Sequence, residues 1–250
     1  MTVIYPEPIY DLRELAKCNL HVHTSFSSCA HPDALPQDIV READRLGLDT
    51  IALTDHFNDL GHDERMLAQI DELKRAVDAI PHKVRVLYGF ELSGYGIGRW
   101  LEKDSTLEKL DYRLYSCNHF HLNFWDHPED RSPRGYAEFA MAIVRSVVEA
   151  DRADCIAHPL VARFIPFDDK TLVTKAMKDE EIYELSCVLR DHNTAWEINT
   201  KGVAGDPDFV RRLWNIGKEV GTTFHIGTDT HNIANIDTLA DIDYIESVVY

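Results

Sequence analysis

Residues 18–23 read Cys18-Asn19-Leu20-His21-Val22-His23, a short and largely apolar run that closes on two histidines. Six further runs share this pattern, because each carries a histidine or a carboxylate at or near its end: 50–56, 84–91, 112–119, 155–158, 195–199 and 224–231. Runs of this length and composition are typical of buried β-strands. The sequence therefore predicts seven strands, each with a polar side chain near the point where the strand stops.

Helical patterns separate most of these runs. The clearest helix is expected over 36–47, where Pro36 stands at the start, apolar residues follow at helical spacing, and Gly47 stands at the end. Similar patterns lie at 64–79, 134–150, 179–191 and 207–219. Segment 93–111, with three glycines and a charged stretch, is expected to form a long loop with only a short helix. The alternation predicts an α/β fold with a parallel sheet, in which residues 1–250 form a single domain.

The bulk composition argues against several classes of protein. The chain has 250 residues and a formal net charge of −17, which disfavours nucleic-acid binding through phosphate contacts. No stretch approaches the roughly 20 apolar residues of a membrane span, and the first residues lack the basic region and apolar core of a signal peptide. The five cysteines are scattered, as expected for reduced thiols. A cytoplasmic protein without a membrane partner is therefore expected.

The polar residues at the strand ends have the chemistry of metal ligands. In a closed parallel barrel the carboxyl ends of all strands meet on one face, so side chains far apart in sequence converge there. Histidines two positions apart on a strand share one face. The predicted ligands are His21, His23, His56, Glu91, His119, His158, Asp229 and His231. Imidazole and carboxylate groups together suit Zn, Mn or Fe.

Each of these signals also has an ordinary structural explanation when it is taken alone. A histidine pair such as His21 and His23 can also lie on the solvent-exposed face of a strand. Glu91 could instead form a salt bridge. Glu197 and Asn199, at the end of the sixth run, are expected to shape the pocket rather than to bind metal. The metal interpretation is favoured because so many of these residues stand at strand ends.

In their order along the chain, the motifs resemble those of a known family. H-x-H-T at His21, T-D-H ending at His56, G-x-E ending at Glu91, H-P at His158 and D-x-H at Asp229 are similar to the motifs of the polymerase and histidinol phosphatase (PHP) family. The resemblance covers nearly the whole chain. It implies a distorted (β/α)7 barrel, similar to a TIM barrel, that forms a single PHP-type metallohydrolase domain with two or three divalent ions.

The resemblance also implies how the ligands are shared among the ions. One metal would be bound by His21, His23, Glu91 and Asp229, a second by Glu91, His119 and His158, and a third by His56 and His231. Family members commonly place a His or Asp six residues after the second histidine of the first motif, where this chain has Cys29. A thiolate can bind Zn, but His31 matches the other imidazole ligands, and Asp33 or water could complete the site instead. The sequence favours His31 slightly.

The ligand set and the resemblance predict a metal-dependent phosphoric ester hydrolase. Divalent ions lower the pKa of bound water toward 7 and hold phosphoryl oxygens, so hydrolysis by a metal-activated hydroxide is expected. Glu91, which would bridge two ions, and Asp229 are the predicted catalytic residues. Arg163 and Lys201 lie in strand-to-helix loops and could bind phosphate, although either could be an ordinary surface cation. The expected partner is a small phosphorylated substrate, such as histidinol phosphate, a nucleotide or a small phosphodiester.

Two alternatives remain open at the level of sequence. An amidohydrolase-type metal hydrolase shares the first H-x-H and the last aspartate, but it usually carries a bridging lysine where this chain has His119. A catalytically inactive, metal-stabilised PHP module could retain the ligand set without turnover.

Overall fold

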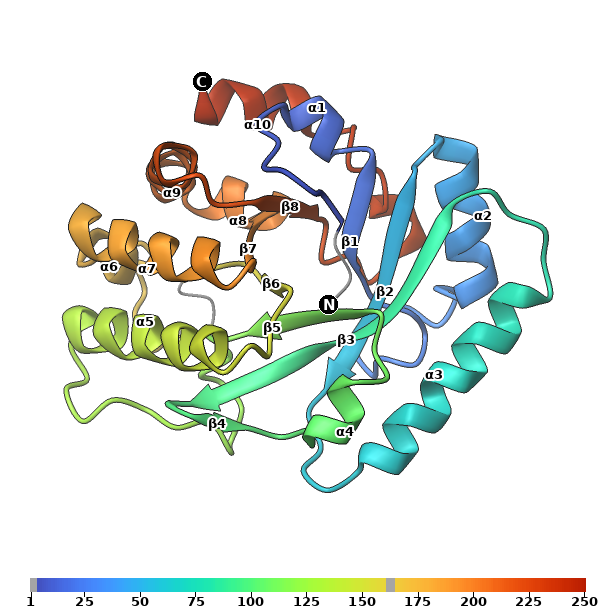
Figure 1. Cartoon of the computed structure of the whole chain (residues 1–250), viewed down its shortest axis with the longest axis horizontal. Helices are drawn as coiled ribbons and strands as arrows, with labels where there is room; N and C mark the ends of the chain where they lie inside the picture. Colours follow the sequence, from blue (N-terminus) through green and yellow to red (C-terminus); the bar gives the residue numbers. More distant parts are fainter. Residues whose placement is uncertain (1–3, 161–164) are drawn as a thin grey trace.

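Seven parallel strands form a nearly closed barrel in residues 4–160 and 165–250, the parts of the chain that the computed structural model describes (Figure 1). In barrel order these strands are β1 (Cys18–Val22), β2 (Thr50–Phe57), β3 (Arg85–Gly96), β5 (Tyr112–Ser116), β6 (Cys155–Ile156), β7 (Ala195–Asn199) and β8 (Phe224–Gly227). The barrel closes through an isolated parallel bridge between Val22 and Thr230. The predicted barrel of seven strands in a single domain is confirmed.

Helices cover the outside of the barrel (Figure 1). The long ones are α2 (Pro36–Leu46), α3 (Asp63–Asp78), α5 (Pro133–Glu149), α7 (Asp179–Asp191), α9 (Pro207–Val220) and α10 (Ile242–Val249). Short ones are α1 (Leu12–Leu15), α4 (Asp104–Leu107), α6 (Leu172–Lys175), α8 (Thr200–Gly205) and the 3-10 helix η1 (Ile233–Asn235). The five helices predicted from sequence are all present. None of the helices in the described residues combines the length and apolar character needed to cross a membrane.

The segment after Glu91 differs from its prediction. Strand β3 does not stop at Glu91 but continues to Gly96, and it turns back into the short antiparallel strand β4 (Arg99–Trp100). Gly98 has φ +67 in the turn, and a side chain at Gly96 would collide with Asp126, so these glycines serve a hairpin rather than a loop. Short helix α4 follows, as expected.

Alternation along β3 decides where Glu91 points. Leu87 belongs to a small apolar cluster, whereas Tyr88 and Phe90 belong to the large cluster that also contains the helices' buried residues. Because successive side chains face opposite sides of a strand, Glu91 lies on the same side as Leu87, toward the interior of the barrel. The parallel register also pairs Glu91 with His56 on β2. Glu91 therefore lies in the middle of β3, but it is level with His56 near the carboxyl end of β2.

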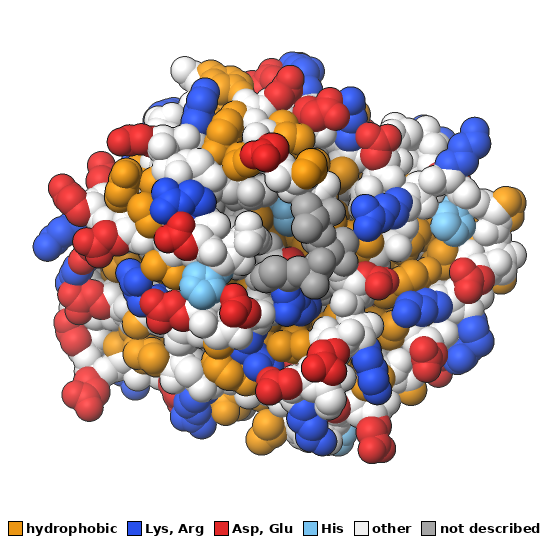
Figure 2. Space-filling model, viewed as in Figure 1, with side chains coloured by type: hydrophobic (Ala, Val, Ile, Leu, Met, Phe, Trp, Pro, Cys, Tyr) orange, Lys and Arg blue, Asp and Glu red, His pale blue; other side chains and the backbone are white. Residues whose placement is uncertain are grey.

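The charged surface agrees with the sequence composition. On the face shown in Figure 2, acidic side chains lie among basic ones. The described residues of this face do not form the continuous basic surface on which nucleic-acid binding through phosphates depends.

Candidate metal centre

The eight predicted ligands come together at the carboxyl ends of the strands. Six of them line a pocket of about 360 Å³, namely His56, Glu91, His119, His158, Asp229 and His231, and Cys29, His121 and Lys201 line it as well. The other two, His21 and His23, are completely buried and lie next to Glu91 and Asp229. Arg163, predicted to bind phosphate, lies outside the described residues.

Four ligand atoms meet at the deepest point of the site. The Nε2 atoms of His21 and His23 lie 3.0 Å apart. Asp229 Oδ1 is 3.7 Å from the first of these nitrogens and 3.4 Å from the second. Glu91 Oε2 is 3.7 and 3.5 Å from the same two atoms. Two imidazole nitrogens and two carboxylate oxygens therefore converge on one point.

The hydrogen bonds of His23 show which of its nitrogens carries the proton. The Ser27 hydroxyl donates to Asp55 Oδ1 at 2.6 Å and accepts from the backbone N–H of His56 at 3.3 Å. It also lies 3.2 Å from His23 Nδ1. A hydroxyl has a single proton, so with that proton directed to Asp55, His23 must donate its Nδ1–H. Its Nε2 then offers a lone pair to the point of convergence, as a metal ligand does.

Electrostatics show that this point demands positive charge. Burial lowers the pKa of His21, but the carboxylates of Glu197, Glu91 and Asp229 outweigh burial and raise it to about 10. Burial raises the pKa of Glu91, yet the surrounding histidines hold it well below its usual range. The carboxylates therefore favour positive charge at this point, which a divalent cation would supply while releasing a proton.

Glu91 is placed to serve two metal positions. Its Oε1 lies 2.9 Å from His158 Nε2 and 3.5 Å from His119 Nε2. Its Oε2 faces the opposite group, at 2.7 Å from His56 Nδ1. A carboxylate with one oxygen directed to each of two ligand groups has the geometry of a bridge.

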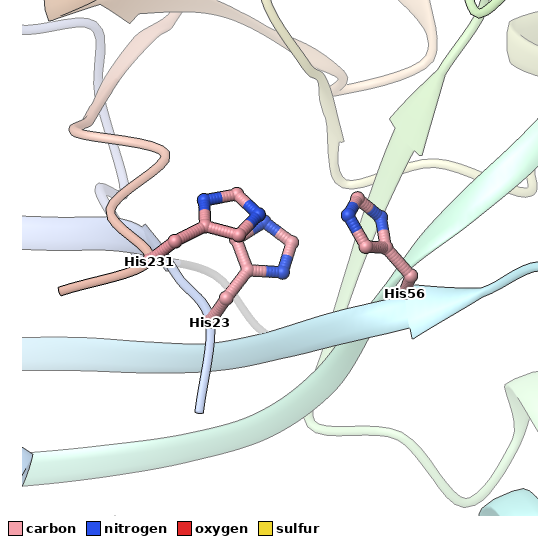
Figure 3. A group of neighbouring side chains, drawn as sticks. All are labelled: His23, His56 and His231. Atoms are coloured by element: carbon pink, nitrogen blue, oxygen red, sulfur yellow. The ribbon is translucent and has the colours of Figure 1, made fainter. Parts of the chain in front are cut away.

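A third group consists of His23, His56 and His231 (Figure 3). His23 directly follows β1, His56 lies near the end of β2, and His231 lies in the segment that follows β8. The rings of His23 and His231 are stacked, with centroids 4.1 Å apart and an interplanar angle of 21°. The ring of His56 faces this pair, 4.4 Å from the His23 centroid. The resemblance assigned only His56 and His231 to a third metal, whereas the structure places His23 beside both.

Cys29, rather than His31, lies next to this third group. Burial raises the pKa of the Cys29 thiol, but hydrogen bonds to His231 and His56 lower it to about 6. The His31 ring is exposed and forms an ion pair with Asp33. The slight preference of the sequence for His31 is therefore not supported by the position of its side chain.

Two of the predicted ligands have unusual backbone conformations. His158 has φ +29 and Asp229 has φ +49, values in the left-handed region that non-glycine residues seldom adopt. Such strain persists only where surrounding contacts enforce it, and it often marks functional sites. The lysine predicted to bind phosphate, Lys201, contacts Asp229: its ammonium donates to the backbone carbonyl and lies 3.5 Å from Oδ2.

Comparison with known proteins places the chain in a family. The family model of the PHP domain matches residues 19–201. The chain belongs to the PHP domain family. It is 26% identical over 229 residues to a protein of Thermotoga maritima named "probable histidinol-phosphatase", a match that covers 87% of this chain and 85% of that one. A protein of Aliivibrio fischeri named "probable phosphatase" is 25% identical over 217 residues, covering 84% of this chain and 76% of that one.

The fold of this PHP domain is also found in a solved structure. The histidinol phosphate phosphatase of Lactococcus lactis, crystallised with zinc, L-histidinol and phosphate, is similar with a TM-score of 0.62 and 18% sequence identity. The match covers 94% of each chain. At this identity the likeness establishes the barrel fold, and the roles of individual residues rest on the geometry above.

Proposed function

We propose that this PHP-family protein is a metal-dependent phosphatase that hydrolyses a small phosphoric ester. The observation that carries the proposal is the convergence of His21 Nε2, His23 Nε2, Glu91 Oε2 and Asp229 Oδ1 within 3.0 to 3.7 Å. Lone-pair donors gathered so closely are stable together only around positive charge. The family match and the two relatives named as phosphatases support the reaction class.

We assign the ligands to two metal positions and a candidate third. His21, His23, Glu91 and Asp229 hold the first ion, and Glu91, His119 and His158 hold the second. His56 and His231 hold the third, with Cys29 in place of His31. Zn, Mn or Fe suit these donors. Bound divalent ions supply a nucleophile at neutral pH and offset the charge of the phosphoryl group.

The protein's own groups then bind and orient the ester. Glu91 would contribute one oxygen to each of two metal positions, and Asp229 would contribute Oδ1 to the first. Lys201 lies at the pocket and provides a cation for a phosphoryl oxygen, and we retain Arg163 in the same role. A pocket of about 360 Å³ is at the small end of the range for ligand sites, which favours a compact substrate such as histidinol phosphate over a polymer. The five unpaired cysteines support a reducing, cytoplasmic setting.

A substrate screen tests this proposal. The chain is loaded in turn with Zn, Mn and Fe and assayed with histidinol phosphate, nucleoside monophosphates, an aryl phosphate and a small phosphodiester, and, for comparison, with an amide and a lactone. Turnover of at least one phosphoric ester in the loaded protein is expected. Hydrolysis of amides or lactones instead would favour an amidohydrolase-type enzyme, and metal binding without turnover of any ester would favour an inactive module.

A further inference from the structure

Glu197 lies in the floor of the metal centre without being one of its proposed ligands. It belongs to β7 and is only 3% exposed. Its Oε1 lies 2.8 Å from Nδ1 of His21. Its Oε2 accepts hydrogen bonds from the backbone N–H of His158 and, at 3.3 Å, from the side-chain amide of Asn199. One buried carboxylate thus contacts a ligand from β1 and the backbone of a ligand that follows β6.

The neighbouring strand is shaped to permit this contact. A Cβ at Gly227 of β8 would collide with Glu197 Oε1, and it would lie 2.5 Å from the Cβ of His21. Real Cβ atoms do not approach other atoms so closely, so a larger residue would force the carboxylate and the imidazole apart. The glycine leaves the space through which Glu197 reaches across β8 to His21.

A count of protons fixes the tautomer of His21. Glu197 Oε2 already accepts two N–H groups, so the acid group acts as an acceptor there. The 2.8 Å contact to Oε1 is then satisfied by the Nδ1–H of His21. Once a cation displaces the second proton of the ring, the lone pair of His21 is left on Nε2, the atom that faces His23 and Asp229. Histidine ligands in metal sites commonly donate their second N–H to a carboxylate in this way, which orients the ring and raises its basicity.

The second contact of Glu197 acts on the backbone of His158. This residue has φ +29, a conformation that needs an outside restraint. The bond from its N–H to Glu197 provides one. In that conformation the His158 ring reaches Glu91 Oε1 at 2.9 Å.

We propose that Glu197 is a positioning residue for two metal positions at once: it fixes the tautomer of His21 at the first and the backbone of His158 at the second. The inference rests on the proposed function insofar as the site holds metal, but it concerns metal binding and not the reaction. Loss of the carboxylate is therefore expected to weaken both positions, and not only the one whose ligand it touches through a side chain.

Zinc binding by the full chain tests the inference. Wild type, Glu197→Gln and Glu102→Gln are stripped of metal and titrated with zinc against a competing chelator. Glu102 is the matched control, because it is equally buried at 3% exposure and bonded to Arg152, away from the metal centre. We expect Glu197→Gln to raise the zinc dissociation constants of two sites by about 10- to 100-fold. Glu102→Gln should bind zinc as wild type does. Unchanged affinity in Glu197→Gln, or weakening at one site alone, would overturn the dual role.

The ring nitrogens of His21 give a second measurement that does not depend on the folding of Glu197→Gln. In the zinc-loaded wild type labelled with ¹⁵N-histidine, His21 should carry its proton on Nδ1 and the metal on Nε2, and a His21→Gln spectrum assigns the signal. Metal on Nδ1 would contradict the inference even if Glu197→Gln did not fold. A wild type that binds zinc but hydrolyses no phosphoric ester would refute the proposed function, while the zinc affinities would still decide the role of Glu197.

Discussion

Buried histidines at the two ends of the barrel have pKa values shifted in opposite directions. At the amino ends of the strands, His225 of β8 is 5% exposed, and its Nδ1 makes a 2.8 Å hydrogen bond with the hydroxyl of Tyr112. Burial lowers its pKa to about 3, so it is neutral. At the carboxyl ends, His21 is buried just as deeply, yet carboxylates raise its pKa to about 10.

The difference shows what distinguishes a structural histidine from a ligand. One neutral hydrogen bond is enough to satisfy His225, and burial then keeps it uncharged. The carboxyl end instead gathers imidazoles and carboxylates whose acceptor atoms face one another, an arrangement that requires a proton or a cation. Burial of a histidine alone therefore does not predict a metal site, whereas convergence of acceptors does.

Removing metal should have the largest effect on activity, because it empties the site at the carboxyl end of the barrel. Chelation should abolish hydrolysis of an aryl phosphate, and Zn, Mn or Fe should restore it, because the ions supply the nucleophile and the charge. The measurement is kcat before chelation, after chelation and after reloading, with the protein confirmed as folded throughout. Turnover at an unchanged rate in chelator would show that the converging groups do not work through a metal.

Within the metal centre, replacing Glu91, the proposed bridge between two metal positions, should lower kcat more than replacing His231. Glu91→Gln should lower kcat by about a hundredfold or more, a loss comparable to that of a major electrostatic stabiliser. His231→Ala should cost less, because His231 serves only the candidate third metal. The assay compares kcat at matched metal content. Equal losses, or a larger loss in His231→Ala, would mean that the ligand assignments are wrong.

Sequence predicts the scaffold well and the supporting contacts poorly. Pro36 and Gly47 marked the ends of α2, because their backbone preferences are local. Ligands such as His158 and Asp229 could be anticipated because a parallel barrel brings its strand ends to one face. The contact of Glu197 with His21 could not, because it depends on the gap at Gly227 and on three strands being neighbours. Its only signal was a carboxylate at the end of an apolar run.

The choice between Cys29 and His31 also lay beyond the sequence, because it depends on the path of a loop. The backbone N–H of His31 bonds to the carbonyl of His231 at 2.8 Å, but its side chain turns to Asp33. With the loop held there, Cys29 is the residue whose side chain faces His56 and His231. Spacing along the chain cannot distinguish these two outcomes.

Replacing Cys29 and His31 one at a time should show which of them binds the third metal, through a modest change in metal content. Cys29→Ser should lower the bound metal by up to one ion per chain, because a hydroxyl is a far poorer ligand than a thiolate. His31→Ala should leave metal content unchanged and so serves as the matched control. The measurement is metal per chain in both variants beside wild type. Loss in His31→Ala alone would reverse the assignment, and no loss in either would mean that another group completes the third site.

The smallest effect is expected at the amino end of the barrel, where it should appear in stability and not in catalysis. Because the pKa of His225 is about 3 in the folded protein and ordinarily near 6.5, the unfolded chain binds a proton between these pH values that the folded chain does not. His225 should therefore contribute a loss of up to about 1.4 kcal/mol per pH unit to the free energy of unfolding as the pH falls through this range. His225→Gln should therefore lose less stability on acidification than wild type, while Tyr112→Phe, which keeps the buried imidazole, should lose as much as wild type does. Urea unfolding of the metal-free proteins at pH 7, 6 and 5 gives the comparison. Parallel pH dependence in wild type and His225→Gln would show that His225 is charged in the folded state, and would remove the contrast between the two ends.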